Sequence, residues 1–154
     1  MTHASADRVQ TLRTRLRPGK RVLVILTAGN LAITQAVISL LREHCEMGSE
    51  VNMDNVPNMF EAARHVGEQL REVHRRDSAA MLSQGVEFSA SLILGGQSGT
   101  EPPSLFCIYS VGNFIEATAD TPYFQIGEAK YGKPIIDRVV TRSTSIAQAA
   151  KCAL

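Results

Sequence analysis

The sequence lacks any apolar run long enough to cross a membrane. Its longest run, residues 22–26, has only five aliphatic side chains. A membrane-spanning helix needs about 20 consecutive apolar residues. No hydrophobic segment of the signal-peptide type follows the charged N-terminal residues either. We therefore expect a protein that neither spans a membrane nor is secreted.

Excess charge and cysteine are also scarce. The 16 basic and 15 acidic residues leave a net charge of +1, which is too small to attract nucleic acid or an anionic membrane over long range. The three cysteines are Cys45, Cys107 and Cys152, and they form no CxxC pair. Their odd number leaves at least one thiol without a disulfide partner. An odd thiol suits a reducing compartment. We expect a cytoplasmic protein without nucleic-acid or membrane partners.

The first strong structural signal is the segment RVLVILT at residues 21–27. Its side chains are apolar at both odd and even positions, which predicts a central β-strand covered on both faces. Residues 1–20 are different, because they combine few apolar residues with five basic ones: Arg8, Arg13, Arg15, Arg17 and Lys20. We predict a solvated arm or a short helix there, and a single domain over residues 21–154.

Two helices are predicted after this strand. Apolar residues from Ile33 to Leu41 recur at helical spacing after the turn at residues 28–30. The second helix has Asn58 as its N-cap and Glu61 three residues later, which is the pattern of a capping box. Its apolar positions predict an end near Arg76.

The second half of the chain predicts several strands followed by two helices. Residues 88–94 and 105–109 read as a β-hairpin, and residues 114–117 and 123–126 read as further short strands. Helical patterns cover residues 131–139 and 145–154. The order of elements predicts a layered α/β domain with antiparallel pairing.

Four segments resemble the bacterial Anbu (ancestral beta subunit) family of proteasome-related proteins. They are residues 21–43, 60–73, 112–139 and 149–154, and they occur in the order found in that family. The resemblance implies a four-layer αββα sandwich of the N-terminal-nucleophile hydrolase type. It also implies a threonine-type peptidase or amidohydrolase, in which the N-terminal residue attacks an amide carbonyl and its own α-amine is the base.

The sequence departs from this family at three places. Residues 1–20 contain no recognisable nucleophile strand, and Thr2 lies in a segment without a strand pattern. The segment nearest to the family's lysine-bearing stretch is residues 11–14, where Thr14 replaces the lysine. The family continues beyond Leu154 with a region that supports the nucleophile's amine. The resemblance therefore implies an incomplete sandwich, truncated at both ends, with impaired catalysis and no catalytic side chain assigned.

The turn after the first strand matches the family's oxyanion and substrate-pocket loop. The resemblance implies that the backbone N–H of Gly29 donates to the oxyanion and that Thr27, Ala28 and Leu31 line the pocket. A glycine lets the backbone approach substrate without a Cβ in the way. Taken alone, without the resemblance, residues 27–30 favour a plain tight turn between a strand and a helix over an oxyanion site.

No metal or cofactor site is predicted. His44 and Cys45 are neighbours on a helix, so their side chains diverge. His65 and His74 are nine residues apart, which places them on opposite helix faces. Gly95 and its neighbouring glycines lie between two strands and do not open a helix, so a phosphate loop is not indicated.

Three functions remain open at the level of sequence. The first is a subunit of a proteasome-like peptidase or amidohydrolase that acts on a peptide or amide substrate. The second is a non-catalytic subunit that self-associates into a ring-like or helical oligomer. The third is a small anion- or nucleotide-binding module, in which the strand, the turn and the helix N-terminus bind the anion.

Overall fold

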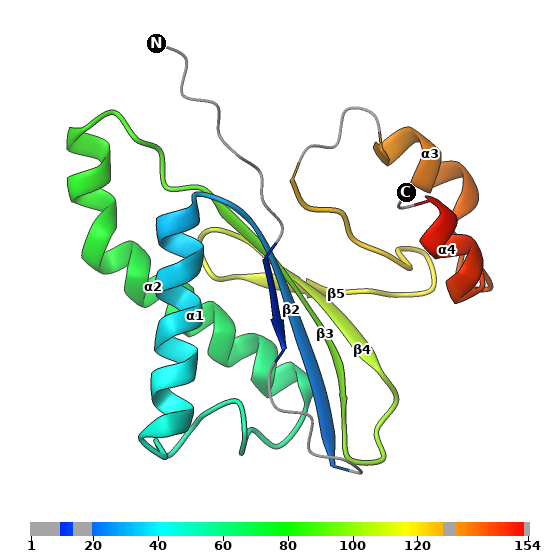
Figure 1. Cartoon of the computed structure of the whole chain (residues 1–154), viewed down its shortest axis with the longest axis horizontal. Helices are drawn as coiled ribbons and strands as arrows, with labels where there is room; N and C mark the ends of the chain where they lie inside the picture. Colours follow the sequence, from blue (N-terminus) through cyan, green and yellow to red (C-terminus); the bar gives the residue numbers. More distant parts are fainter. Residues whose placement is uncertain (1–9, 14–19, 128–131, 153–154) are drawn as a thin grey trace.

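The computed structural model describes residues 10–13, 20–127 and 132–152. They form a mixed α+β fold in which one antiparallel sheet is covered on one face by two helices (Figure 1). In the described part of the chain this gives one helical layer and one sheet of the expected four-layer sandwich. The incomplete sandwich predicted from the sequence is therefore confirmed. No helix in this part is long and apolar enough to cross a membrane.

The sheet has five strands in the order in which they occur along the chain. β1 is Gln10–Arg13, β2 is Arg21–Gly29, β3 is Ala90–Ser98, β4 is Ser104–Ile108 and β5 is Phe114–Glu116. Every neighbouring pair is antiparallel. The predicted hairpin is confirmed as β3 and β4, and β2 is confirmed as an interior strand between β1 and β3.

The strand β1 corrects the prediction for the N-terminal segment. We expected a solvated arm or a short helix, but residues 10–13 pair with residues 24–27 of β2. Without this pairing, the N–H and C=O groups along that edge of β2 would have no strand partner. The sequence of β1 is too short and too polar to show a strand pattern by itself.

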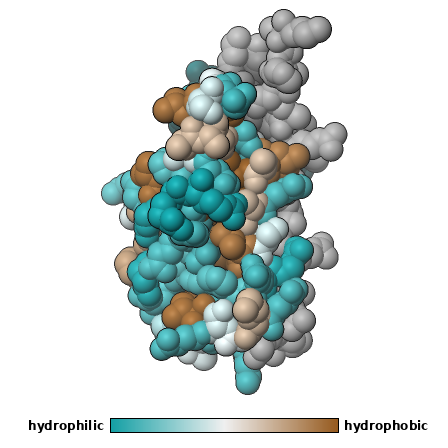
Figure 2. Space-filling model, turned by 90° about the vertical axis from the view of Figure 1, so that its left-hand side faces the viewer, coloured by the Kyte–Doolittle hydropathy of each residue, from teal (hydrophilic) through white to brown (hydrophobic). Residues whose placement is uncertain are grey.

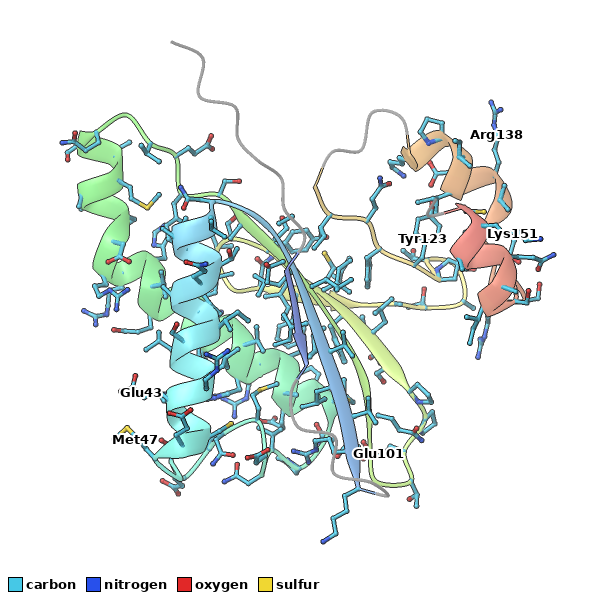
Figure 3. All side chains as sticks on the ribbon, viewed as in Figure 1. Glu43, Met47, Glu101, Tyr123, Arg138 and Lys151 are labelled. Atoms are coloured by element: carbon cyan, nitrogen blue, oxygen red, sulfur yellow. The ribbon has the colours of Figure 1, made fainter. Side chains whose placement is uncertain are left out.

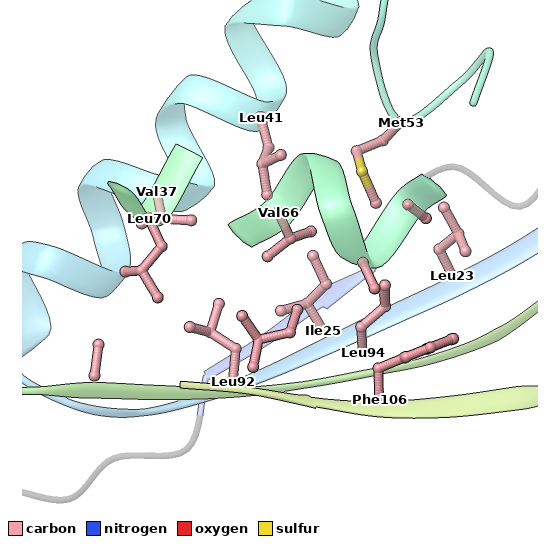
Figure 4. Close-up of a cluster of buried hydrophobic side chains, with 14 of the residues drawn as sticks. Leu23, Ile25, Val37, Leu41, Met53, Val66, Leu70, Leu92, Leu94 and Phe106 are labelled. Atoms are coloured by element: carbon pink, nitrogen blue, oxygen red, sulfur yellow. The ribbon is translucent and has the colours of Figure 1, made fainter. Parts of the chain in front are cut away.

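The core lies between the sheet and the two long helices, α1 (Leu31–Glu46) and α2 (Met59–Ser83). Figure 4 shows side chains from both helices meeting those of β2, β3 and β4. Val37 and Leu41 come from α1, while Val66 and Leu70 come from α2, and each is at most 1% exposed. Burial of such side chains contributes about 1.5–3 kcal/mol each before entropy losses. The outer face of these helices is mainly hydrophilic (Figure 2).

The face of the sheet away from α1 and α2 is also apolar but less completely covered. Register pairs place one row of side chains across it: Leu26, Ile93, Cys107 and Ile115. Ile93 and Cys107 are buried, whereas Ile115 is 44% exposed. Val22, on the same face, is 43% exposed. The prediction that β2 is covered on both faces therefore holds fully only for the helical side.

Two predictions for the chain after residue 59 were wrong and two were confirmed. The helix α2 was predicted to end near Arg76, but it continues to Ser83 because residues 79–82 are good helix formers and the first breaker is Gly85. Residues 123–126 do not form the predicted strand. The helices α3 (Gly132–Val139) and α4 (Ile146–Cys152) confirm the last two helical predictions.

The C-terminal helices lie on the opposite side of the sheet from α1 and α2 (Figure 1). Figure 3 shows Tyr123 beside them. Its hydroxyl donates to Asp137 of α3, which also accepts from Lys133 at 2.9 Å. These groups are exposed, so the contacts orient α3 and add little stability.

Candidate functional site

The predicted oxyanion donor, Gly29, is the last residue of β2 and turns the chain into α1. Its φ is +103°, a conformation that residues with a Cβ rarely adopt. Gly29 lies opposite Ala90 of β3, and a Cβ at this position would be 2.6 Å from the carbonyl oxygen of Ser89. Both the dihedral angle and the close approach of β3 therefore require glycine.

Asn30 holds the turn through its backbone and through its side chain. Its backbone N–H donates to the Ser89 carbonyl at 2.9 Å. Its side-chain oxygen accepts from the N–H groups of Ala32 at 2.9 Å and Ile33 at 3.4 Å, which caps α1. Gly29 is thus held between a paired strand and a capped helix.

The three predicted pocket residues point in different directions. Thr27 is 1% exposed and lies in the row that faces α1 and α2, where its Oγ1 is buried without a hydrogen-bond partner among the described residues. Ala28 is on the opposite face of β2, where its Cβ would be 3.8 Å from a Cβ added to Gly127. Leu31 is 46% exposed at the start of α1. A shared pocket role for these side chains stays a prediction.

A cavity of about 490 Å³ lies away from this turn. It is open to solvent and is bounded by the β3–β4 hairpin, the residues after β5, and Arg142. Gly95 and Gly96 expose their backbone there, and Glu116 supplies a carboxylate. None of the four residues predicted to form the site lines it, so it is a separate feature.

Cys107 is a buried thiol on the face of the sheet away from α1 and α2. Its burial raises the pKa of the thiol, an effect only partly offset by a hydrogen bond with Tyr109. A thiol with a raised pKa holds little thiolate at neutral pH and is a poor nucleophile. Cys107 is therefore poorly suited to act as a nucleophile.

Two threonines matched catalytic positions in the sequence, Thr2 that of the nucleophile and Thr14 that of the lysine. Both lie outside the described residues. No group of three or more potential metal ligands occurs among the residues that are described. The described residues provide a glycine turn at the end of a buried strand, and the contacts with Ser89 hold it in place.

Solved structures identify the relatives of this fold. An Anbu protein from Yersinia bercovieri is 50% identical and superposes with a TM-score of 0.81 over 94% of this chain. An Anbu protein from Hyphomicrobium sp. strain MC1 is 46% identical over 98% of this chain and 68% of its own, with a TM-score of 0.78. The chain belongs to the Anbu family. A third Anbu structure, from Pseudomonas aeruginosa, is described as a helical assembly and gives 44% identity and a TM-score of 0.84 over 99% of this chain.

This Anbu-family chain spans only part of its relatives. It covers 58% of the Yersinia bercovieri protein and 64% of the Pseudomonas aeruginosa protein. Comparison with family sequence models and with curated protein sequences gave no match. The family, which is related to the proteasome, is thus established by sequence identity and structure together.

Proposed function

We propose that this chain is a self-associating subunit of a proteasome-like peptidase or amidohydrolase that acts in the cytoplasm. The observation that carries the proposal is the 50% identity to an Anbu structure over 94% of the chain, at a TM-score of 0.81. The role we assign to the chain's own residues is that of an oxyanion site and a scaffold. The backbone N–H of Gly29 is the donor in that site.

Gly29 suits this role because its backbone is already organised. The carbonyl of the scissile amide gains negative charge as the nucleophile attacks, and a fixed N–H donor stabilises that charge without moving. One such donor lowers the barrier by about 2.7–4 kcal/mol. The contacts of Ser89 and Asn30 hold the turn in place before substrate arrives.

We further propose that the chain by itself turns over substrate slowly. Its sequence has Thr14 where the family has a lysine, so a neutral side chain replaces the cation that tunes the nucleophile.

An NMR titration tests the oxyanion role directly, because proline, the only residue without a backbone N–H, cannot adopt the φ of +103° at Gly29. A phosphinic peptide carries a tetrahedral anion that resembles the transition state and needs no covalent nucleophile. We expect the Gly29 amide resonance to shift more than that of Gly48, which lies in a loop beyond α1. Shifts at other amides with none at Gly29 would overturn the assignment.

Self-association is tested by light scattering at several concentrations. The partly exposed apolar residues of the far sheet face, Val22 and Ile115, are the surface expected to drive it. We expect a Val22→Lys, Ile115→Lys double variant to lower the average mass, and Leu82→Lys on α2 to leave it unchanged. A wild-type chain that stays monomeric at every concentration would count against this part of the proposal.

A non-catalytic assembly subunit remains the second candidate, and it is favoured if the oligomer forms but peptide hydrolysis stays at the background rate. The anion-binding module is disfavoured by the structure. The N–H groups of Ala32 and Ile33, which would bind the anion, already donate to the side chain of Asn30. An anion would have to displace this cap.

A further inference from the structure

Two histidines from different helices meet between α1 and α2. His44 is in the last turn of α1 and His65 is in the first half of α2, and their ring centroids are 5.4 Å apart. His65 is 3% exposed and His44 is half-buried. The packing of the two helices therefore brings together two imidazoles that are 21 positions apart in the sequence.

Both rings have a buried nitrogen without a partner. Nδ1 of His44 and Nε2 of His65 are shielded from solvent, and neither has a hydrogen-bond partner among the described residues. Buried polar atoms in folded proteins are nearly always satisfied by a hydrogen bond, water or a bound ion. Two such nitrogens on adjoining rings point to a shared ligand.

From these contacts we propose that His44 and His65 bind one divalent transition-metal ion between α1 and α2. Imidazole nitrogens are suitable ligands for zinc, nickel and copper ions. Two imidazoles on one tetrahedral zinc ion, with metal–nitrogen bonds of about 2.0–2.1 Å, place their ring centroids roughly 5.2 Å apart. The observed separation of 5.4 Å is close to that value. Water would complete the coordination of the ion.

The surroundings favour a cation at this point. The carboxylate of Glu68 is 4.0 Å from Nδ1 of His65. Nδ1 is the second ring nitrogen of His65, and Nε2 is the proposed ligand. A carboxylate beside the second nitrogen is a common means of orienting a metal-bound histidine. Arg64 is the nearest competing cation, but it is paired with Glu61 and Glu68. The negative end of the α1 dipole, where His44 lies, adds a favourable field.

Calorimetric titration of the full chain with zinc chloride, after removal of adventitious metal by a chelator, tests the proposal. We expect one zinc ion per chain, with affinity reduced at least ~10-fold in His44→Gln and in His65→Gln, since loss of one of two ligands is more damaging than loss of an outer partner. His74→Gln is the matched control, because His74 is on the same helix as His65 but packs against Phe88, and the affinity of this variant should equal that of the wild type.

Two further variants keep the test decisive. His44 is half-buried, so His44→Gln is expected to fold even if His65→Gln does not, and circular dichroism checks this. Cys45→Ser examines the neighbouring thiol and should leave binding unchanged. Zinc should also raise the melting temperature of the wild type and not of His44→Gln. Absence of saturable binding, equal affinity in His44→Gln, or loss of binding in Cys45→Ser would each overturn the assignment.

Discussion

Gly67 of α2 and Gly112 of the β4–β5 turn touch each other backbone to backbone. A Cβ added to Gly67 would be 2.3 Å from the carbonyl oxygen of Gly112, and a Cβ added to Gly112 would be 2.3 Å from that of Gly67. Arg71 reinforces the contact by donating to the Gly112 carbonyl at 2.7 Å. The position of α2 on the sheet is therefore set where neither residue can carry a side chain.

This contact predicts that Gly67→Ala destabilises the protein although alanine is the better helix former. The exchange would gain up to about 1 kcal/mol in a free helix. Overpacking against Gly112 costs about 1–3 kcal/mol, and the backbone cannot yield as a flexible side chain would. We expect a lower midpoint of urea unfolding. Ser78→Ala on the same helix is the control and should stabilise slightly; a higher midpoint for Gly67→Ala would contradict the packing described here.

Arg21 predicts a second stability effect, because it joins the sheet to the loop between α1 and α2. Its guanidinium donates to the carbonyl of Met53 at 3.0 Å, to that of Val56, and to Oγ of Ser98 at 3.0 Å. Hydrogen bonds to a charged group contribute about 1.5–3 kcal/mol. Arg21→Met should lower the free energy of unfolding by about that amount. Arg21→Lys should recover only part, since an ammonium cannot span three acceptors; full recovery would mean that charge alone matters.

Gly29 should tolerate alanine poorly even in the absence of substrate. The new Cβ would be 2.6 Å from the Ser89 carbonyl, at a φ of +103°. Overpacking of this kind costs about 1–3 kcal/mol in addition to the backbone strain. Gly48→Ala is the control, because Gly48 also has a positive φ, +64°, but has no neighbouring atom within 4 Å of the added Cβ. Differential scanning calorimetry should show the larger loss for Gly29→Ala, and equal losses would rule out the close approach.

The buried thiol of Cys107 predicts a pH effect at the alkaline side. Burial raises its pKa above the ordinary value of 9.0, so the folded chain retains the proton that the unfolded chain releases. The contribution of Cys107 to stability is complete below pH 9.0 and falls as pH rises toward the folded pKa. Urea unfolding at increasing pH should show this loss in the wild type and less of it in Cys107→Ala. An identical pH dependence in both would contradict it.

Thiol reactivity gives an independent measurement on the same residue. At neutral pH, Cys107 should react with a disulfide reagent more slowly than Cys45 and Cys152, which are only half-buried. The slow phase should be absent in Cys107→Ala. A Cys107 that reacts as fast as the other two would show that the far sheet face opens readily.

Local patterns were sufficient for most of the secondary structure. The periodicity of α1, the Asn58 cap of α2 and the β3–β4 hairpin were predicted because each depends on residues a few positions apart. The strand β1 was missed because its conformation depends on an unpaired edge of β2 and not on its own composition. The overestimated strand at residues 123–126 has the opposite cause, since its apolar residues find no partner strand.

The candidate site also has some features that local sequence predicts and others that depend on tertiary packing. The position of Gly29 at the end of the first buried strand could be predicted, because a strand pattern followed by Gly-Asn and a helix pattern is a local signal. That Thr27 faces the helices while Leu31 is exposed could not, because it depends on which face of β2 the helices cover. The pairing of His44 with His65 had no sequence signal, since the two belong to separate helices.

The sequence by itself determined where most of the strands and helices lie, which glycine must turn the chain, and the Anbu resemblance that solved structures then confirmed. Those features follow from the spacing of apolar side chains and from the absence of a Cβ, which act over a few residues. The tertiary structure decided the rest: the contact of Gly67 with Gly112, the acceptors of Arg21 and the neighbours of each histidine. Such contacts join residues distant in the chain, so they exist only once helices and sheet have packed together.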